Sequence, residues 1–362
     1  MYYEKLMELK IKKTNNLSGT VKIPGSKSHA IRGIFLQMLA EGEGQLTNLP
    51  DSEDIQNAQK TCQAIKNGDL QIPAGNSGLA ARFALPLLEP QQKLVCGEQM
   101  QARPMQPLIK AIKELEEKHE TEVDGKISQY LSALLIAQPL KPYDSIITVK
   151  NPNERPYINM TLAWIRDFGG EIQEQNNTFH IKGGQKYTAK SKDIPGDWSS
   201  AAVFIAANAL IPGEIQIEGL TKDPLQADSI LPELIENWPQ EIDCSKCPDL
   251  LPILAVIATQ KKLTRLKNAT HSRIKESDRI TAMAEALQKM GAKIEEHEDG
   301  LTIQKSELSG AEVDGKKDHR IIMALTLAGM LAEGQTTIKN AEGLAKTYPN
   351  FIESIRKIGA NI

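Results

Sequence analysis

The chain has 362 residues, of which 40% are hydrophobic and 25% charged, as is typical of a globular protein large enough for two domains. The formal net charge of −3 excludes a global basic field for nucleic acid or an anionic membrane, so anion binding has to come from locally clustered cations. No apolar stretch is long enough to span a membrane, and the first residues lack a signal-peptide pattern, so we expect a cytoplasmic protein.

Six apolar segments rich in small residues recur along the chain, and each is followed by a short strand. We expect buried helices over residues 28–40, 78–88, 128–140, 199–211, 249–258 and 320–332. Their starts are 50, 50, 71, 50 and 71 residues apart. The longer units contain additional strand material after a second, amphipathic helix, for example over residues 293–313. We therefore predict that three short units lack a hairpin.

The sixth unit ends only 42 residues after its helix begins, and the N-terminal segments ELKIKKT (8–14) and GTVKIP (19–24) can supply its missing hairpin. Six units make an α/β fold of two domains with three units each. We expect a discontinuous C-terminal-type domain, residues 1–24 with 196–362, and an inserted N-terminal-type domain, residues 25–195. A Pro-Gly pair stands at each crossover, where small loop residues favour a hinge.

Polar residues occupy the starts of the buried helices, where free N–H groups and the helix dipole favour anions. N-capping by Ser, Asn and Asp explains part of this pattern, but it does not require the nearby cations Lys27, Arg82, Arg103 and Arg320. If the three helices of each domain point the same way, two such faces meet across a cleft. A further cluster, RIKESDR (273–279), places Lys275 and Arg279 on one face at helical spacing.

Two other motifs are given a simpler interpretation. Cys244 and Cys247 have CxxC spacing without a second pair, so ordinary reduced thiols are favoured over a zinc site. The GSKS tetrapeptide is similar to the end of a P-loop, but Gly19 and Gly25 are six residues apart and Ser26 intervenes before Lys27. In a P-loop the lysine directly follows the second glycine, so this spacing excludes a P-loop nucleotide site.

Ten motifs follow one another in order over nearly the whole chain. They are PGSKS (24–28), GNSGLAAR (75–82), RPMQPL (103–108), SQYLSALL (128–135), RPYINMTL (155–162), GDWSSAA (196–202), PDLLPI (248–253), RIKESDR (273–279), DHR (318–320) and AKTYP (345–349). Together they resemble the enolpyruvyl transferases, and specifically the EPSP synthase family. The resemblance implies two domains of three α/β units joined by two crossover strands, which agrees with the repeat.

The resemblance implies transfer of the enolpyruvyl group of phosphoenolpyruvate to the 5-hydroxyl of shikimate 3-phosphate in the shikimate pathway, which leads to chorismate and the aromatic amino acids. It implies that phosphoenolpyruvate binds to Lys27, Gly78, Arg103, Gln129, Arg279, Arg320 and Lys346. It implies that shikimate 3-phosphate binds to Lys27, Ser28, Arg32, Ser128, Gln129, Tyr157, Asp249, His271 and Lys275. Lys27, Asp249 and Glu276 are the implied proton-transfer groups, without a fixed acid or base. No metal, organic cofactor, nucleic acid or membrane partner is implied, and we expect a monomer.

The chain departs from the family pattern at several positions. GKISQ (125–129) is one residue short and offers only Ser128, and Glu154 stands where a phosphate-binding serine is common. A carboxylate facing a phosphate costs about 1–4 kcal/mol. Either Glu154 turns away, or the phosphate is held differently, or the acceptor differs. His271 replaces an asparagine of some members. Leu79 and Phe83 replace a threonine and a proline, so we expect altered affinity for analogues such as glyphosate.

Three other functions can be weighed against the one implied by the resemblance. A paralogue acting on another hydroxylated acceptor is favoured by Glu154 and opposed by the retained Lys27, Arg32 and Lys275. The sister enzymes acting on UDP-N-acetylglucosamine carry a cysteine on a loop that here reads EQMQARPM (98–105). A catalytically inactive binding protein would predict loss of Lys27, Glu276 or Asp249, and all three are present.

Overall fold

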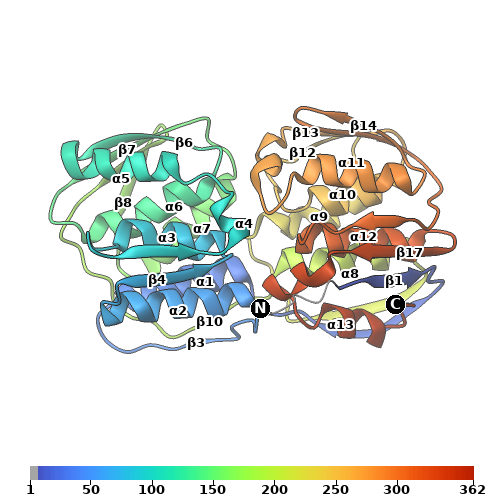
Figure 1. The fold of residues 1–362 in the computed structure, drawn as a ribbon, viewed down its shortest axis with the longest axis horizontal. Coiled ribbons are helices and arrows are strands. Elements are labelled where there is room, and N and C mark those ends of the chain that lie inside the picture. Colours follow the sequence, from blue (N-terminus) through green and yellow to red (C-terminus); the bar gives the residue numbers. More distant parts are fainter. Residues whose placement is uncertain (1–6) are drawn as a thin grey trace. The chain divides into compact units, whose positions relative to one another are not determined.

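The structure is a computed structural model that describes residues 7–362. Residues 1–6, which belong to the segment for which we predict no signal peptide, lie outside the described residues. The chain divides into two compact units, Gly25–Pro195 and Met1–Pro24 with Gly196–Ile362. We call them the inserted unit and the discontinuous unit. In the discontinuous unit, dark blue N-terminal strands lie among yellow to red elements (Figure 1).

The inserted unit is built around three buried helices, α1 (Lys27–Leu39), α3 (Gly78–Ala84) and α6 (Ser128–Ala137). Every residue of α6 except Gln129 is buried, as expected for a helix that is apolar on all sides. Helices α2 (Glu53–Asn67), α5 (Gln106–Lys118) and α7 (Arg155–Asp167) pack around these three. Short helical segments are η1 (Leu85–Leu87), α4 (Glu98–Gln101) and η2 (Gln138–Leu140).

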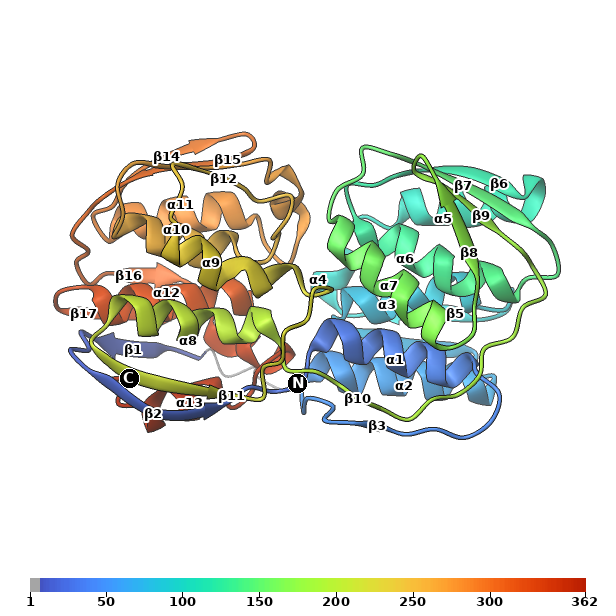
Figure 2. The same ribbon diagram turned by 180° about the vertical axis from the view of Figure 1, so that it is seen from behind.

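The discontinuous unit repeats this plan with α8 (Trp198–Leu210), α10 (Leu251–Thr259) and α12 (His319–Leu331), which contact one another in all three pairs. All nine residues of α10 are buried. Helices α9 (Leu231–Glu236), α11 (Arg279–Lys289) and α13 (Phe351–Lys357) are the outer helices, seen from the other side in Figure 2. Short 3-10 helices are η3 (Ala227–Ile230), η4 (Thr270–Ile274) and η5 (Ala341–Lys346).

Two four-stranded sheets, one in each unit, have the same topology. In the inserted unit the order is β6 (Glu120–Asp124), β7 (Ser145–Lys150), β9 (Thr178–Ile181) and β8 (Ile172–Gln175). In the discontinuous unit it is β12 (Glu241–Asp243), β13 (Thr264–Lys267), β15 (Gly300–Gln304) and β14 (Lys293–His297). In both sheets the first pair is parallel and the hairpin pairs antiparallel. The predicted repeat is therefore present.

The three short units lack the hairpin within the described residues, as predicted. The outer helix runs directly into the next strand from Asn67 to Gln71, from Lys118 to Glu120 and from Glu236 to Glu241. The pair formed by β4 (Gln71–Gly75) and β5 (Lys93–Cys96) is correspondingly a sheet of only two strands. A short unit keeps its buried helix and the start of that helix, so the loss affects the periphery.

The N-terminal strands confirm one expectation and correct another. Strand β1 (Leu9–Lys12) pairs antiparallel with β17 (Gln335–Lys339), which in turn pairs parallel with β16 (Glu312–Asp314). It thus takes the hairpin position in the sixth unit. Strand β2 (Leu17–Lys22) does not form a hairpin with β1 but pairs parallel with β11 (Gly213–Glu218). In the inserted unit, β10 (Lys192–Asp193) pairs parallel with β3 (Leu46–Thr47) in the same way.

The two crossover glycines occupy equivalent tight positions. A Cβ atom on Gly25 would lie 2.0 Å from the carbonyl oxygen of Asn48, and one on Gly196 would lie 2.2 Å from that of Gly219. Neither glycine has a positive φ. Close backbone approach therefore requires glycine at both positions, whether or not they act as the predicted hinge.

The RIKESDR segment is not a helix, so the prediction that Lys275 and Arg279 share a helix face is wrong. Helix η4 ends at Ile274, and α11 begins at Arg279 after its N-cap residue Asp278. The Asp278 carboxylate accepts hydrogen bonds from the N–H groups of Ile280 and Thr281, both at 3.1 Å. This cap fixes the helix start at Arg279, because a capping carboxylate satisfies free N–H groups of the first turn.

Candidate active site

Lys27 is the first residue of α1 and forms an ion pair with Asp54 of α2, at 2.9 Å between Nζ and Oδ2. Both side chains are largely buried, so this pair is shielded from solvent and orients the ammonium group. Asp54 is not among the sequence-predicted site residues. The available signal was its place in the first turn of an amphipathic helix, which also has a simple explanation as a favourable dipole contact.

Arg32 lies on α1 and is almost completely buried between α6 and α7. Its guanidinium donates to the Thr161 hydroxyl at 2.8 Å and to the Tyr157 carbonyl at 3.1 Å, and it also reaches Ser28 O and Ser132 Oγ. Burial lowers its pKa to about 10, so it stays charged at neutral pH. Arg32 thereby links Ser28 and Tyr157, two further predicted acceptor ligands, through their backbone carbonyl groups.

Gly78, Arg103 and Gln129 are brought together at the starts of α3 and α6. A Cβ atom on Gly78 would lie 2.5 Å from Nη1 of Arg103. Arg82 donates to the Gln129 side-chain oxygen and, at 3.3 Å, to the Pro104 carbonyl, and its guanidinium lies over the Tyr130 ring. Three predicted phosphoenolpyruvate ligands are therefore neighbours, and Arg82 connects them.

Glu154 faces Ser128. One carboxylate oxygen of Glu154 accepts hydrogen bonds from the Ser128 hydroxyl at 2.6 Å and from the Ser128 N–H at 3.1 Å. Glu154 is 1% exposed and adopts a left-handed backbone conformation with φ of 53°. Glu154 therefore lies against Ser128, one of the predicted acceptor ligands, and the choice among the three possibilities open from sequence stays a prediction.

In the discontinuous unit, Arg279 is surrounded by three carboxylates. Its guanidinium donates to Asp318 at 2.9 Å, to Asp249 at 2.8 Å and to Glu276 at 2.9 Å, and the side chain is 1% exposed. Asp318 also caps α12 through the Arg320 N–H at 2.9 Å. Sequence patterns place Asp318 only as a cap, but the structure shows that it also orients Arg279.

The guanidinium group of Arg320 is buried and only partly hydrogen-bonded within residues 7–362. Nη2 lies 3.7 Å from an Asp249 oxygen, whereas Nε and Nη1 have no hydrogen-bond partner within residues 7–362. Burial opposes ionisation of Asp249, but the charges of Arg279, Arg320 and Lys275 outweigh it and hold the pKa of Asp249 well below its usual range. Asp249 is therefore an ionised carboxylate at neutral pH.

The remaining predicted residues also belong to the discontinuous unit. Lys275 follows η4 and interacts electrostatically with Asp249. His271 is buried within η4. Lys346 ends η5, and its ammonium group donates to the Lys317 carbonyl at 3.4 Å.

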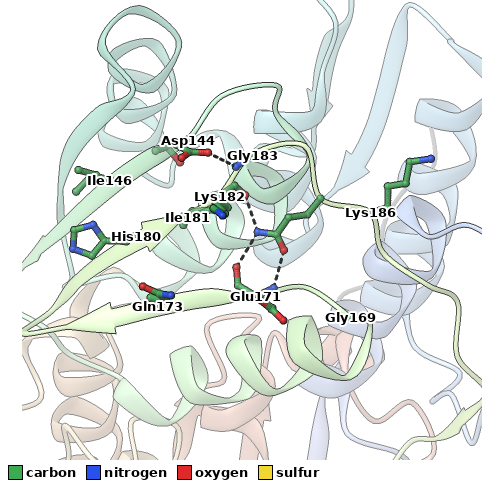
Figure 3. Close-up of a pocket in the computed structure, with 12 residues that line it drawn as sticks. Asp144, Ile146, Gly169, Glu171, Gln173, His180, Ile181, Lys182, Gly183 and Lys186 are labelled. Atoms are coloured by element: carbon green, nitrogen blue, oxygen red, sulfur yellow. Dashed lines mark hydrogen bonds between the residues drawn. The ribbon is translucent and has the colours of Figure 1, made fainter.

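A separate hollow of about 560 Å³ lies on the inserted unit, by β7 and β9 (Figure 3). The Gln185 side chain bridges its rim by donating to the carbonyl oxygens of Glu171 and Lys182 and accepting from the Glu171 N–H. None of the sequence-predicted site residues lines it. No helix among residues 7–362 is long and apolar enough to cross a membrane.

Solved structures have the same fold. The structure of EPSP synthase from Acinetobacter baumannii matches with a TM-score of 0.80 and 23% identity, covering 97% of this chain and 98% of that chain. A second structure of EPSP synthase from this organism matches with a TM-score of 0.74 and 21% identity over 98% and 99% of the two chains. The fold is therefore the two-domain enolpyruvyl transferase fold.

The sequence comparisons identify the family. The family model for EPSP synthase (3-phosphoshikimate 1-carboxyvinyltransferase) matches residues 11–355. The 3-phosphoshikimate 1-carboxyvinyltransferase of Acetivibrio thermocellus is 35% identical over 98% of this chain and 99% of its own length. That of Methanocaldococcus jannaschii is 32% identical over 97% and 98%. The chain belongs to the EPSP synthase family.

The chain is shorter than its relative from Acetivibrio thermocellus. The alignment with the Acetivibrio relative extends over 420 positions, although this chain has only 362 residues and is covered almost completely. The relative therefore contains segments that this chain lacks. The three units without a hairpin are the places in the fold where such segments can be missing.

Proposed function

We propose that the residues grouped above in each unit bind the two substrates of the family's reaction. This enzyme transfers the enolpyruvyl group of phosphoenolpyruvate to the 5-hydroxyl of shikimate 3-phosphate and releases inorganic phosphate. Both substrates are multiply charged anions, which accounts for buried cations in a chain of net charge −3. A cytoplasmic location and a monomeric state stay predictions.

One observation carries the proposed binding of phosphoenolpyruvate. Arg320 is buried, and two of its guanidinium nitrogens, Nε and Nη1, have no acceptor among the described residues. Unsatisfied buried donors cost about 1–3 kcal/mol each, so a site with such donors gains from an incoming anion. The planar guanidinium suits a carboxylate or phosphate bidentately. Arg279, in contrast, donates to three carboxylates already, so we assign it to orienting Asp249 and Glu276 as well as to charge balance.

The proton transfers are assigned from the charges. Addition of the 5-hydroxyl oxygen to phosphoenolpyruvate needs one proton removed from that hydroxyl and one delivered to the methylene carbon. Loss of phosphate then returns the methyl group to a methylene by releasing a proton. The ionised Asp249 can orient that hydroxyl by accepting a hydrogen bond from it, but its depressed pKa makes it a weak base. Lys27, held by Asp54, and Glu276, held by Arg279, are the proposed proton carriers.

Acceptor binding is proposed at the start of α6. Ser128, Arg32 and Tyr157 lie together there, and Ser128 is bound by Glu154 in this structure. The phosphate of the acceptor and the Glu154 carboxylate are both anions, so they compete for the same donors. This competition favours a second candidate function, transfer to a hydroxylated acceptor without that phosphate.

The test is a phosphate-release assay with phosphoenolpyruvate and shikimate 3-phosphate. We expect release that requires both substrates and is lost in Lys27→Met but kept in Lys110→Met, an exposed lysine of α5. Parallel reactions with unphosphorylated shikimate distinguish the two candidates. Release with shikimate alone as acceptor would favour the second function, and no release with either, from folded protein, would overturn both.

A further inference from the structure

Asp228 is a buried carboxylate that the sequence motifs do not include. It lies in η3 and is 2% exposed, and neither of its oxygens accepts a hydrogen bond of normal geometry among residues 7–362, although the Ser199 side chain lies close enough to interact with it. Carboxylates are almost never buried without a partner, because an unpaired charge in the interior is costly. A buried aspartate without a well-formed hydrogen bond therefore indicates a group that holds a proton or meets a ligand.

The surroundings of Asp228 come from the starts of all three buried helices of the discontinuous unit. Asp197 and Ser199 lie at the start of α8, Cys247 and Asp249 lie just before α10, and Arg320 lies in the first turn of α12. Each of these five side chains interacts electrostatically or by hydrogen bonding with Asp228. Two of them, Asp249 and Arg320, belong to the candidate active site.

The pKa values of Asp228 and Asp249 are shifted in opposite directions. Burial and the charge of Asp249 raise the pKa of Asp228 to about 7, with a further contribution from Asp197, against the opposing effects of Arg320 and Ser199. The pKa of Asp249 is instead depressed by its cationic neighbours. Pairs of titratable groups whose environments push their pKa values apart mark acid and base roles in active sites.

We infer that Asp228 is a positioning residue that carries a proton when an anionic substrate binds Arg320, so that binding of phosphoenolpyruvate is coupled to proton uptake. This inference rests on the proposed function, in which Arg320 is a ligand of phosphoenolpyruvate. It assigns to Asp228 a role that neither the family motifs nor the comparisons give it.

The physical reason is that Asp228 and the ligand compete for the guanidinium of Arg320. An ionised Asp228 neutralises part of the Arg320 charge and repels an incoming anion. A protonated Asp228 does neither, and its O–H group can donate to an oxygen of the ligand. The proton comes from solvent, and no covalent bond changes. Affinity for phosphoenolpyruvate should therefore fall as the pH rises above about 7, by up to about tenfold per pH unit for one linked proton.

The experiment measures proton uptake directly. Phosphoenolpyruvate is titrated into the full-length protein at pH 8 by calorimetry, in two buffers of different ionisation enthalpy, with wild type, Asp228→Asn and Glu312→Gln. Glu312→Gln removes one negative charge from an exposed pair with Lys339 in the same unit. At pH 8 the phosphate group of the ligand is already ionised, because its second pKa is about 6. The dissociation constant is also measured from pH 6.5 to 8.5. Titration of the ligand's own phosphate group over this range is the same for all three proteins, so it cancels in the comparison.

We expect wild type and Glu312→Gln to take up a measurable fraction of a proton, and Asp228→Asn to take up none. The dissociation constant should rise with pH in the first two and stay nearly flat in Asp228→Asn, once the ligand's own titration is subtracted. Equal uptake and parallel pH profiles in all three would overturn the inference. If Asp228→Asn does not fold, zero uptake by wild type at pH 8 would overturn it. No binding by wild type at any pH would overturn the proposed role of Arg320, and this inference with it.

Discussion

The Glu154 carboxylate occupies the donors of Ser128, the residue at which α6 begins, through hydrogen bonds of 2.6 and 3.1 Å. An internal anion thus fills the position at which an acceptor phosphate is proposed to bind. Glu154 holds a left-handed conformation that is uncommon for a residue other than glycine, asparagine or aspartate, and such strain persists only where the surroundings impose it. If the acceptor phosphate binds at Ser128 as proposed, Glu154 has to move away first.

We expect Glu154→Ser and Glu154→Gln to lower the KM for shikimate 3-phosphate by about tenfold, because removing a repulsion of roughly 1.4 kcal/mol changes binding tenfold. The KM for phosphoenolpyruvate should not change. Steady-state kinetics with each substrate varied in turn measures both values. Glu174→Gln, which removes an exposed carboxylate paired with Arg155, is the control. An acceptor KM that stays the same or rises in both Glu154 variants would contradict this role.

Gly78→Ala should raise the KM for phosphoenolpyruvate by about tenfold or more while leaving stability nearly unchanged. A Cβ atom there would meet the end of the Arg103 side chain at 2.5 Å, and a flexible arginine can move aside without disturbing the core. The proposed ligand is then misplaced. Kinetics and thermal unfolding of the same preparation separate the two effects. An unchanged KM would remove Arg103 from the binding site, and a large fall in Tm would show that the backbone moves instead.

Asp318→Ala should destabilise the protein by about 3–5 kcal/mol, because it leaves the buried Arg279 short of a partner and uncaps α12. Glu312→Ala breaks the exposed pair with Lys339 and should cost no more than about 1 kcal/mol. Urea unfolding of both variants at neutral pH compares the costs. Similar losses in the two variants would mean that Arg279 is adequately held by Asp249 and Glu276 alone.

The raised pKa of Asp228 has a consequence for stability. Below about pH 4 the carboxyl is protonated in both the folded and the unfolded chain and contributes nothing. As the pH rises toward 7, the Asp228 carboxyl ionises in the unfolded chain but not in the folded protein. The free energy of unfolding therefore falls by up to about 4 kcal/mol, and it is constant at pH values above the folded-state pKa of about 7. Asp228→Asn should therefore raise Tm relative to wild type more at pH 8 than at pH 4.5. An equal difference at both pH values would mean that Asp228 ionises normally in the fold.

Inhibition by glyphosate should differ from that of a family member with threonine and proline in place of Leu79 and Phe83. Both side chains are buried in α3, the helix that begins at Gly78, and the Phe83 ring contacts Phe35 and lies beneath the guanidinium of Arg32. Packing of these two side chains therefore contributes to holding α3 in place. Inhibition constants measured side by side at the same phosphoenolpyruvate concentration test this, and equal constants would show that these residues do not reshape the site.

Much of the fold could be predicted from the sequence because apolar segments recur along the chain at two characteristic spacings. Six apolar stretches such as the one in α10 can only be buried helices, and the spacing of their starts distinguishes units with and without a hairpin. The ordered motifs likewise indicated the family. Periodicity does not report which strand pairs with which, so the hairpin expected from the two N-terminal segments is wrong for β2, which pairs with β11. Local spacing also suggested a helix over residues 273–279, where the Asp278 cap starts the helix at Arg279.

The repeat, the family and most of the residue types at the candidate site follow from the sequence alone, since all of these are carried by local pattern and order. Which charges meet depends on how the chain folds. Asp54 and Lys27, Asp318 and Arg279, and Glu154 and Ser128 are between 26 and 39 residues apart along the chain. Burial of Asp228 beside Asp249 and Arg320 depends on three helix starts converging in space. Electrostatic effects fall off with distance and depend on desolvation, and neither quantity is encoded in sequence spacing.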